Sequence, residues 1–219
     1  VSKRFITKLW NSSKFVLSHL TDFDPSYAPR MKPVDRWIID RTKEAVKEAA
    51  ELLNNYEIGL ARHVVDELFW KDLCDNYIEI VKERLYQPDI HGDEERRSAQ
   101  FAVYYCLLNV LKMYAIYVPH ITEYIYLKGF KDFVGTDSIH LLTWESGLEY
   151  SDAVLRFGEE IKSAIAGIRK YKSENNLSMK AEVPFMTVDG SKAFEDWFKE
   201  SEKDLYSCSH AGEIVYGLS

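Results

Sequence analysis

Cationic, amide and aromatic side chains share one face of the first predicted helix, which covers Ser2 to Leu20. At about 100° per residue, one arc of this helix is apolar and suits a protein core, while the other arc is polar. The polar arc holds Asn11, Phe15 and four cations, and it has no carboxylate. Cations bind phosphates, an amide can read a base edge, and an aromatic ring can stack on a base. The arc therefore suits a polyanion with stackable bases, and its cations are Lys3, Arg4, Lys8 and Lys14.

A plainer interpretation also stays open, in which this arc is a solvated surface and another helix covers Phe15. The net charge of −7 argues against a protein that binds nucleic acid regardless of sequence. The charge is unevenly distributed, because residues 1–50 carry 10 Lys and Arg against 6 Asp and Glu. This is the only basic quarter of the chain, so a polyanion site is expected there, with acidic surface around it.

The composition excludes several other classes of protein. The 219 residues, of which 46% are hydrophobic, can bury the core of one large domain or of one domain with an appendage. No apolar run is long enough to span a bilayer and no signal peptide is visible, so we expect a cytoplasmic protein without a membrane partner. The lack of an initiator Met suggests a fragment or a processed product. The three cysteines are far apart, and we expect Cys74 and Cys106 to be reduced and buried.

Catalytic and metal-binding motifs are not apparent in the sequence. The six histidines have no metal-ligand spacing, and no Glu-x-x-His pair occurs. We find no nucleophile–base pair and no glycine-rich phosphate loop. The sequence therefore predicts no catalytic site, no metal site and no cofactor in this stretch of chain.

Apolar residues at helical spacing place the polar arc at the start of a helical body. They predict long helices over residues 34–56, 60–86, 94–118 and 151–175, a short helix over 120–127, and an extended apolar segment over 138–144. The third helix is apolar on more than one side. Its exposed strip should be acidic and include Asp66, Glu67, Asp72, Asp75, Glu79 and Glu83.

The last part of the chain has a different pattern. Residues 182–188 alternate like a strand, Asp189-Gly190 suggests a turn, residues 191–208 are helical, and 213–216 form a second short strand. The fold expected is mainly α. It comprises an antiparallel helical bundle over residues 1–147, and a C-terminal helix with a small α/β appendage over 148–219.

The second helix adds three candidates for polyanion binding, namely Arg36, Trp37 and Arg41. The two arginines lie off the centre of the apolar stripe and could hold phosphates. Trp37 could stack an unpaired base, but it continues the apolar spacing of its helix, so a place in the core competes with this role.

Several stretches, taken in order, resemble the anticodon-binding region of the valyl-tRNA synthetases, which are class I aminoacyl-tRNA synthetases. Each motif alone is weak, but their order and spacing are fairly specific, and the resemblance covers nearly the whole chain. The stretches are Lys8–Phe15, Asp35–Ile38, Phe69-Trp70, Leu73–Glu79, Val118–Glu123, Ser138-Ile139, Thr143-Trp144 and Ile168–Lys172.

The resemblance implies a tRNA-binding module that recognises the anticodon of valine tRNA. Ligation of valine would be performed, with ATP, by a catalytic domain of the same polypeptide outside this stretch, and no DNA partner is implied. The tRNA-binding candidates are Lys8, Asn11, Lys14, Phe15, Arg36, Trp37 and Arg41.

The sequence also departs from the family in three respects. Glu145 stands where a proline usually follows Thr143-Trp144, and neither nucleotide-binding signature of class I synthetases occurs. No coiled-coil arm appears by Ser219, which resembles archaeal-type members or a truncated chain. Two alternatives remain open: the same module of an isoleucyl-tRNA synthetase, and an acidic helical scaffold for protein interactions.

Overall fold

Serine and proline residues mark the starts of four major helices in the computed structural model, which describes residues 2–219. The helix α1 (Lys3–Ser18) is capped by Ser2, whose Oγ accepts a hydrogen bond from the backbone N–H of Phe5 at 3.2 Å. Ser151 caps α9 (Asp152–Glu174) in the same way. Prolines occupy the first position of α2 (Pro33–Asn54) and α7 (Pro119–Gly129), where their missing N–H has no helical partner to lose.

The remaining elements complete a mainly α fold. Between α2 and α9 lie α3 (Ile58–Asp66), the π-helix η1 (Glu67–Tyr77), α4 (Ile78–Tyr86), α5 (Pro88–His91), α6 (Asp93–Tyr114), α8 (Lys131–Val134) and the 3₁₀ turn η2 (Ile139–Leu141). After α9 come β1 (Met186–Gly190), the 3₁₀ turn η3 (Lys192–Phe194), α10 (Glu195–Glu200), α11 (Glu202–Ser209) and β2 (Ile214–Leu218). The predicted fold class, a helical bundle with a small α/β appendage, is confirmed.

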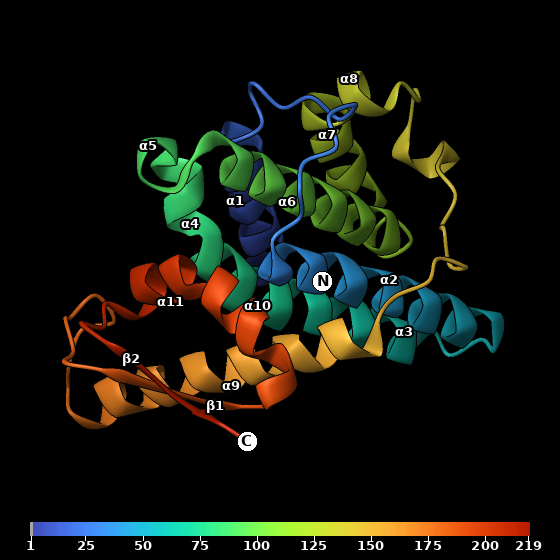
Figure 1. Cartoon of the computed structure of the whole chain (residues 1–219). Coiled ribbons are helices and arrows are strands. Elements are labelled where there is room, and N and C mark those ends of the chain that lie inside the picture. Colours follow the sequence, from blue (N-terminus) through green and yellow to red (C-terminus); the bar gives the residue numbers. More distant parts are fainter. Residues whose placement is uncertain (1) are drawn as a thin grey trace.

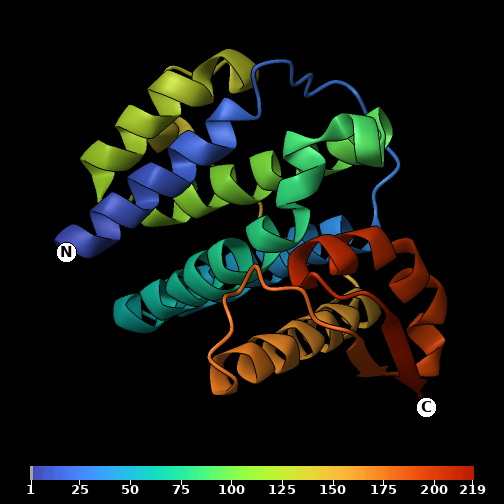
Figure 2. The same ribbon diagram turned by 90° about the vertical axis from the view of Figure 1, so that its left-hand side faces the viewer.

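The helices lie in successive layers (Figures 1 and 2). Helices α1 and α7 lie at one side and α6 lies beneath them. Helix α2 and the helix formed by α3, η1 and α4 pack against each other, and both contact α6. Helix α9 packs along α2 on the other side, and the short sheet covers α9. One buried apolar cluster runs through these layers from Phe5 to Ile214. The division at residue 147 stays a prediction.

The third predicted helix is continuous, but its middle has π-helical rather than α-helical spacing. Buried residues recur there at intervals of five, from Leu68 to Leu73 and from Phe69 to Cys74. This spacing fits the wider turn of a π-helix, in which the backbone forms i→i+5 hydrogen bonds. The wider turn also directs Asp72 inward, where it is 3% exposed and binds Arg41 and Lys162. The prediction that Asp72 lies on an exposed acidic strip is therefore wrong.

The C-terminal appendage has two strands, but their bounds differ from the prediction. Strand β1 begins at Met186 rather than residue 182, because Val183 makes only an isolated bridge, to Ala211. Asp189 and Gly190 are not a turn, since they pair with Gly217 and Leu218 of the parallel strand β2. The predicted helix over 191–208 is divided into η3, α10 and α11. The segment expected to be extended over 138–144 contains the turn η2, in which Ile139 is buried and Leu141 is 68% exposed.

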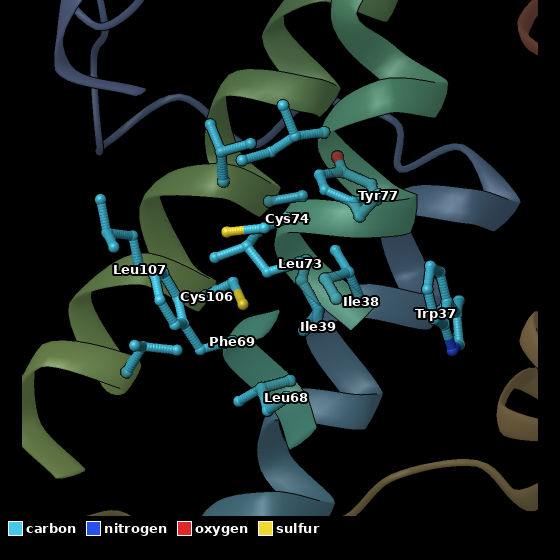
Figure 3. Close-up of a cluster of buried hydrophobic side chains, with 14 of the residues drawn as sticks. Trp37, Ile38, Ile39, Leu68, Phe69, Leu73, Cys74, Tyr77, Cys106 and Leu107 are labelled. Atoms are coloured by element: carbon cyan, nitrogen blue, oxygen red, sulfur yellow. The ribbon is translucent and has the colours of Figure 1, made fainter. Parts of the chain in front are cut away.

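The core between α2, η1 and α6 contains two of the three cysteines, as Figure 3 shows. Cys74 and Cys106 are 7% and 0% exposed and are not in disulfides, so their prediction as reduced, buried thiols is confirmed. Trp37 projects from the opposite side of α2 and is fully buried as well. None of the helices described over residues 2–219 combines the length and the hydropathy that a bilayer crossing needs.

Bulky thiol reagents should modify Cys74 and Cys106 slowly in the folded protein at pH 8. Burial raises the pKa of Cys74 to about 11 and that of Cys106 to about 12, so only about 0.1% or less of either thiol is ionised at that pH. The rate of labelling can be followed by mass spectrometry, with the unfolded protein as the control in which all thiols react rapidly. Rapid modification of both cysteines under native conditions would contradict this packing.

A buried ionic network joins the bundle to the C-terminal helices. Arg84 of α4 is 1% exposed and donates two hydrogen bonds of 2.8 Å to the carboxylate of Asp35 on α2. Its Nε donates to Asp204 of α11 at 2.9 Å. Asp35 also accepts from the hydroxyls of Tyr77 and Ser98. Burial disfavours the charge on Arg84, but the two carboxylates outweigh this effect and raise its pKa, so Arg84 keeps its charge. Burial also raises the pKa of Asp204, which Arg84 partly offsets.

Candidate nucleic-acid interface

The polar arc of α1 faces outward, as its sequence predicts. Phe5, Leu9 and Val16 anchor the opposite arc and are at most 4% exposed. Asn11 and Lys14 are exposed, while Lys8 and Phe15 are half-buried. Figure 2 shows α1 (blue) on the same side of the molecule as the helix over residues 58–86 (teal) and α9 (orange). The arc is therefore part of a surface that several helices form together.

A hollow of about 480 Å³ lies where α1 passes η1, and the ring of Trp70 forms one wall. The Nζ of Lys8 and the guanidinium carbon of Arg4 each lie 5.8 Å from the centroid of this ring. Over residues 2–219, neither Lys3, Arg4 nor Lys8 has a carboxylate oxygen within 4.0 Å. The hollow therefore combines an aromatic surface with cations that are free to bind an anion, and Lys3, Thr7 and Asn11 line the rest of it.

A second aromatic group lies at the other end of the arc. The ring of Phe15 makes edge contacts with His19 at 4.8 Å and with Tyr86 of α4 at 5.8 Å between centroids. Tyr86 is 58% exposed. Burial lowers the pKa of His19, and nearby Arg96 lowers it further, so the imidazole is neutral at pH 7. This group can offer a ring to a base, while the ammonium of Lys14 lies over Trp10, at 6.0 Å from its ring centroid.

The three candidates on α2 do not join these residues. Trp37 is 0% exposed and lies under α9, where a Cβ added to Gly158 would be 1.9 Å from its ring. Its side chain is not available to stack on a base. Of the two roles considered for Trp37, the structure shows the place in the core. Arg36 is exposed, but it lies over Trp197 of α10 at 5.3 Å, on the side of α2 that faces the C-terminal helices.

Arg41 is also committed to contacts within the protein. Its Nε donates to Asp72 at 2.9 Å and a terminal nitrogen donates to Glu44 at 3.0 Å. Lys162 of α9 binds the other oxygen of Asp72 at 2.8 Å. Of the seven sequence candidates, the structure therefore places Lys8 and Asn11 at the hollow beside Trp70 and Phe15 beside Tyr86. The Nζ of Lys14 lies 6.0 Å from the ring centroid of Trp10, and the α2 candidates make other contacts.

Sequence reasoning missed Trp70 and Tyr86 as parts of this surface. Trp70 looked like one more residue of a broad apolar stripe, but the π-helical turn places Leu68 and Phe69 in the core and Trp70 at its edge. The five-residue spacing of the stripe is the signal that could have revealed this. Among residues 2–219, no three His, Cys, Asp or Glu side chains are grouped as metal ligands.

Comparison with known proteins decides the family. The sequence family described as the anticodon-binding domain of tRNA ligase matches residues 35–187, which is more than half of the chain. The chain belongs to this family. The matched range of this anticodon-binding domain begins at Asp35, the carboxylate that binds Arg84 in the buried network, and ends within β1.

Similar proteins over nearly the whole chain are valine–tRNA ligases. That of Thermococcus kodakarensis is 35% identical over 208 residues, which cover 92% of this chain and 23% of the ligase. Those of Orientia tsutsugamushi and Rickettsia conorii are 31% and 32% identical, over 94% and 99% of this chain and 25% and 27% of each ligase. The chain thus spans about a quarter of the length of these curated relatives.

Proposed function

We propose that this anticodon-binding domain belongs to a valine–tRNA ligase and holds the anticodon loop of valine tRNA against the outer face of α1. The observation that carries the proposal is the hollow beside Trp70, where three cations line an accessible ring and have no carboxylate partner within residues 2–219, in a chain of net charge −7. The relatives named above support valine rather than isoleucine as the amino acid. The proposed role in translation places the protein in the cytoplasm.

The structure of an anticodon loop allows a different binding role for each of these side chains. Anticodon bases are single-stranded and can be splayed apart, so their edges and faces are both accessible. Lys8 and Lys14 are assigned to phosphates, Asn11 to a base edge, and Trp70 or Phe15 to stacking. We assign the reaction with ATP and valine to the remainder of the ligase, because the chain itself offers only a binding surface in this proposal.

Salt titration of tRNA binding should separate these tasks. Lys14→Ala should weaken binding to all tRNAs alike and flatten the plot of log K against log salt by about 0.7, the value of one single-strand contact. Asn11→Ala should leave the slope unchanged and reduce the preference for valine tRNA over an anticodon-swapped version by about 1–3 kcal/mol. Fluorescence anisotropy with both tRNAs measures these quantities.

Lys47→Ala is the matched control for Lys14→Ala. Lys47 is exposed on α2, where it lies near Tyr150, and its removal should change neither slope nor preference. If the unmodified protein binds the two tRNAs equally well, the assignment to anticodon reading fails. An isoleucine tRNA in the same titration tests the choice of amino acid, since a preference for it would favour the isoleucine alternative.

A further inference from the structure

A second, larger groove lies between α4, the end of α9 and α11. Figure 2 shows these three elements close together. Its volume is about 830 Å³. Basic residues from separate parts of the chain line it: Lys82 from α4, Arg169 and Lys172 from α9, and Lys180 from the segment that follows α9. These basic residues are not those that line the hollow beside Trp70, so the positive charge of the groove is a separate feature of the surface.

Three of these cations are not neutralised by the protein. Over residues 2–219, Arg169, Lys172 and Lys180 have no carboxylate oxygen within 4.0 Å. Arg169 donates instead to the backbone oxygen of Asp75 at 2.6 Å and to the amide oxygen of Asn76 at 3.3 Å. In a chain with net charge −7, three such cations in one groove form a local surplus of positive charge.

The acids of the groove already have partners. Glu79 binds Lys82 at 2.8 Å, and Glu83 lies 2.7 Å from the Nε2 of His91. Among residues 2–219, neither acid lies within 4.0 Å of the cationic nitrogens of Arg169, Lys172 or Lys180. An anion that enters the groove would meet Arg169 and Lys180 without first displacing an ion pair.

Lys172 is a buried basic residue of the groove. It is 1% exposed, and its ammonium donates to the backbone oxygens of Met179 at 2.8 Å and Ser209 at 2.6 Å. Both partners are neutral carbonyls, and burial lowers the pKa of this lysine. An anion bound at the mouth of the groove would favour its charged form, because opposite charges interact more strongly where water is excluded.

The groove adjoins the surface on α1. Tyr86 lines the groove and also makes the edge contact with Phe15, so the aromatic group at the end of α1 leads into it. Arg169 lines both this groove and a second hollow between η1 and α9, in which Lys71 and Lys162 are paired with Glu67, Asp72 and Glu159. An RNA held on α1 would therefore reach Arg169 and Lys180 by way of Tyr86.

We propose that the groove between α4, α9 and α11 binds the sugar–phosphate backbone of the same tRNA, next to the loop that lies on α1. The proposal rests on the proposed function, since it assumes that RNA occupies α1. Arg169 and Lys180 contact phosphate oxygens, and Tyr86 marks the passage from base contacts to backbone contacts. Backbone binding carries no base information, so this groove contributes affinity and orientation rather than anticodon choice.

Charge reversal at Lys180 tests the groove. Lys180 is exposed and precedes β1, whereas Lys192, an exposed lysine just after β1, lies at the opposite end of the strand and serves as the matched control. We expect Lys180→Glu to weaken binding of valine tRNA and of the anticodon-swapped tRNA equally, by about tenfold at 0.1 M salt. Lys180→Ala should lower the salt slope by about 0.7–0.9, and Lys192→Glu should change affinity less than about twofold.

The outcomes distinguish the groove from the surface on α1. If Lys180→Glu behaves like Lys192→Glu while Lys14→Ala still weakens binding, the groove proposal is overturned and the proposed function stands. If Lys180→Glu weakens only one of the two tRNAs, the groove reads bases, and backbone binding is overturned. If the unmodified protein binds no tRNA, both proposals fall together.

Discussion

Arg84→Met should lower the free energy of unfolding by about 3–5 kcal/mol. The substitution removes the cation from between Asp35 and Asp204, which are 0% and 3% exposed and have no access to water that could solvate their charge. Methionine fills much of the same volume, so the expected loss arises from two carboxylates left unpaired rather than from a cavity. Denaturant titration followed by circular dichroism measures the change.

The control is an arginine whose ion pair is exposed to solvent. Arg97→Met removes a 2.7 Å pair with Asp93 on α6, where the side chains of Arg97 and Asp93 are 34% and 66% exposed. Exposed pairs of this kind contribute about 0.2–1 kcal/mol, so this variant should be close to the unmodified protein in stability. Equal losses in the two variants would mean that the buried network does not stabilise the fold as we argue.

Trp37→Ala should cost about 3–5 kcal/mol of stability and leave the tRNA affinity of the folded protein unchanged. Its ring fills the space between α2 and α9, where Gly158 permits close approach and Lys162 lies 5.7 Å from the ring centroid. Trp37→Phe should cost less than the alanine variant, because the buried indole N–H has no hydrogen-bond partner among residues 2–219. The melting temperature and the Kd for valine tRNA are measured on the same samples.

Trp70→Ala should show the opposite result. Trp70 is only half-buried, so its loss should cost far less stability than loss of Trp37. Loss of its stacking surface should weaken tRNA binding by about 1–3 kcal/mol, and Trp70→Phe should recover part of that affinity. A Trp37 variant that folds normally but binds tRNA poorly would reverse the two roles.

Periodicity predicted the parts of this structure that depend on local chemistry. The helix starts predicted at residues 2, 34, 120 and 151 lie within one residue of the observed ones, which serine caps and prolines at the first position determine. The outward direction of Asn11 and Lys14 follows from the apolar arc opposite them. These features depend only on residues that lie within one or two helical turns in the sequence.

Other features depend on contacts that sequence spacing does not contain. Asp72 is buried because a π-helical turn directs it toward Arg41 and Lys162, which come from two other helices. Arg36 lies over Trp197, more than 150 residues away in the chain. The strand β1 starts later than its alternation suggests because its pairing partner, β2, sets the register from Met186 onward. Each of these outcomes is decided by tertiary packing.

The place of Asp204 in the buried network has a consequence for cooperativity. If α11 detached from the rest of the protein, Arg84 would keep one carboxylate partner and lose the other. Local opening of the C-terminal helices therefore carries an electrostatic penalty inside the bundle itself. Helix α11 and the wall of the groove that it forms are thus coupled to the folding of α2 and α4. We therefore expect α11 to open together with the bundle rather than to fray as an independent tail.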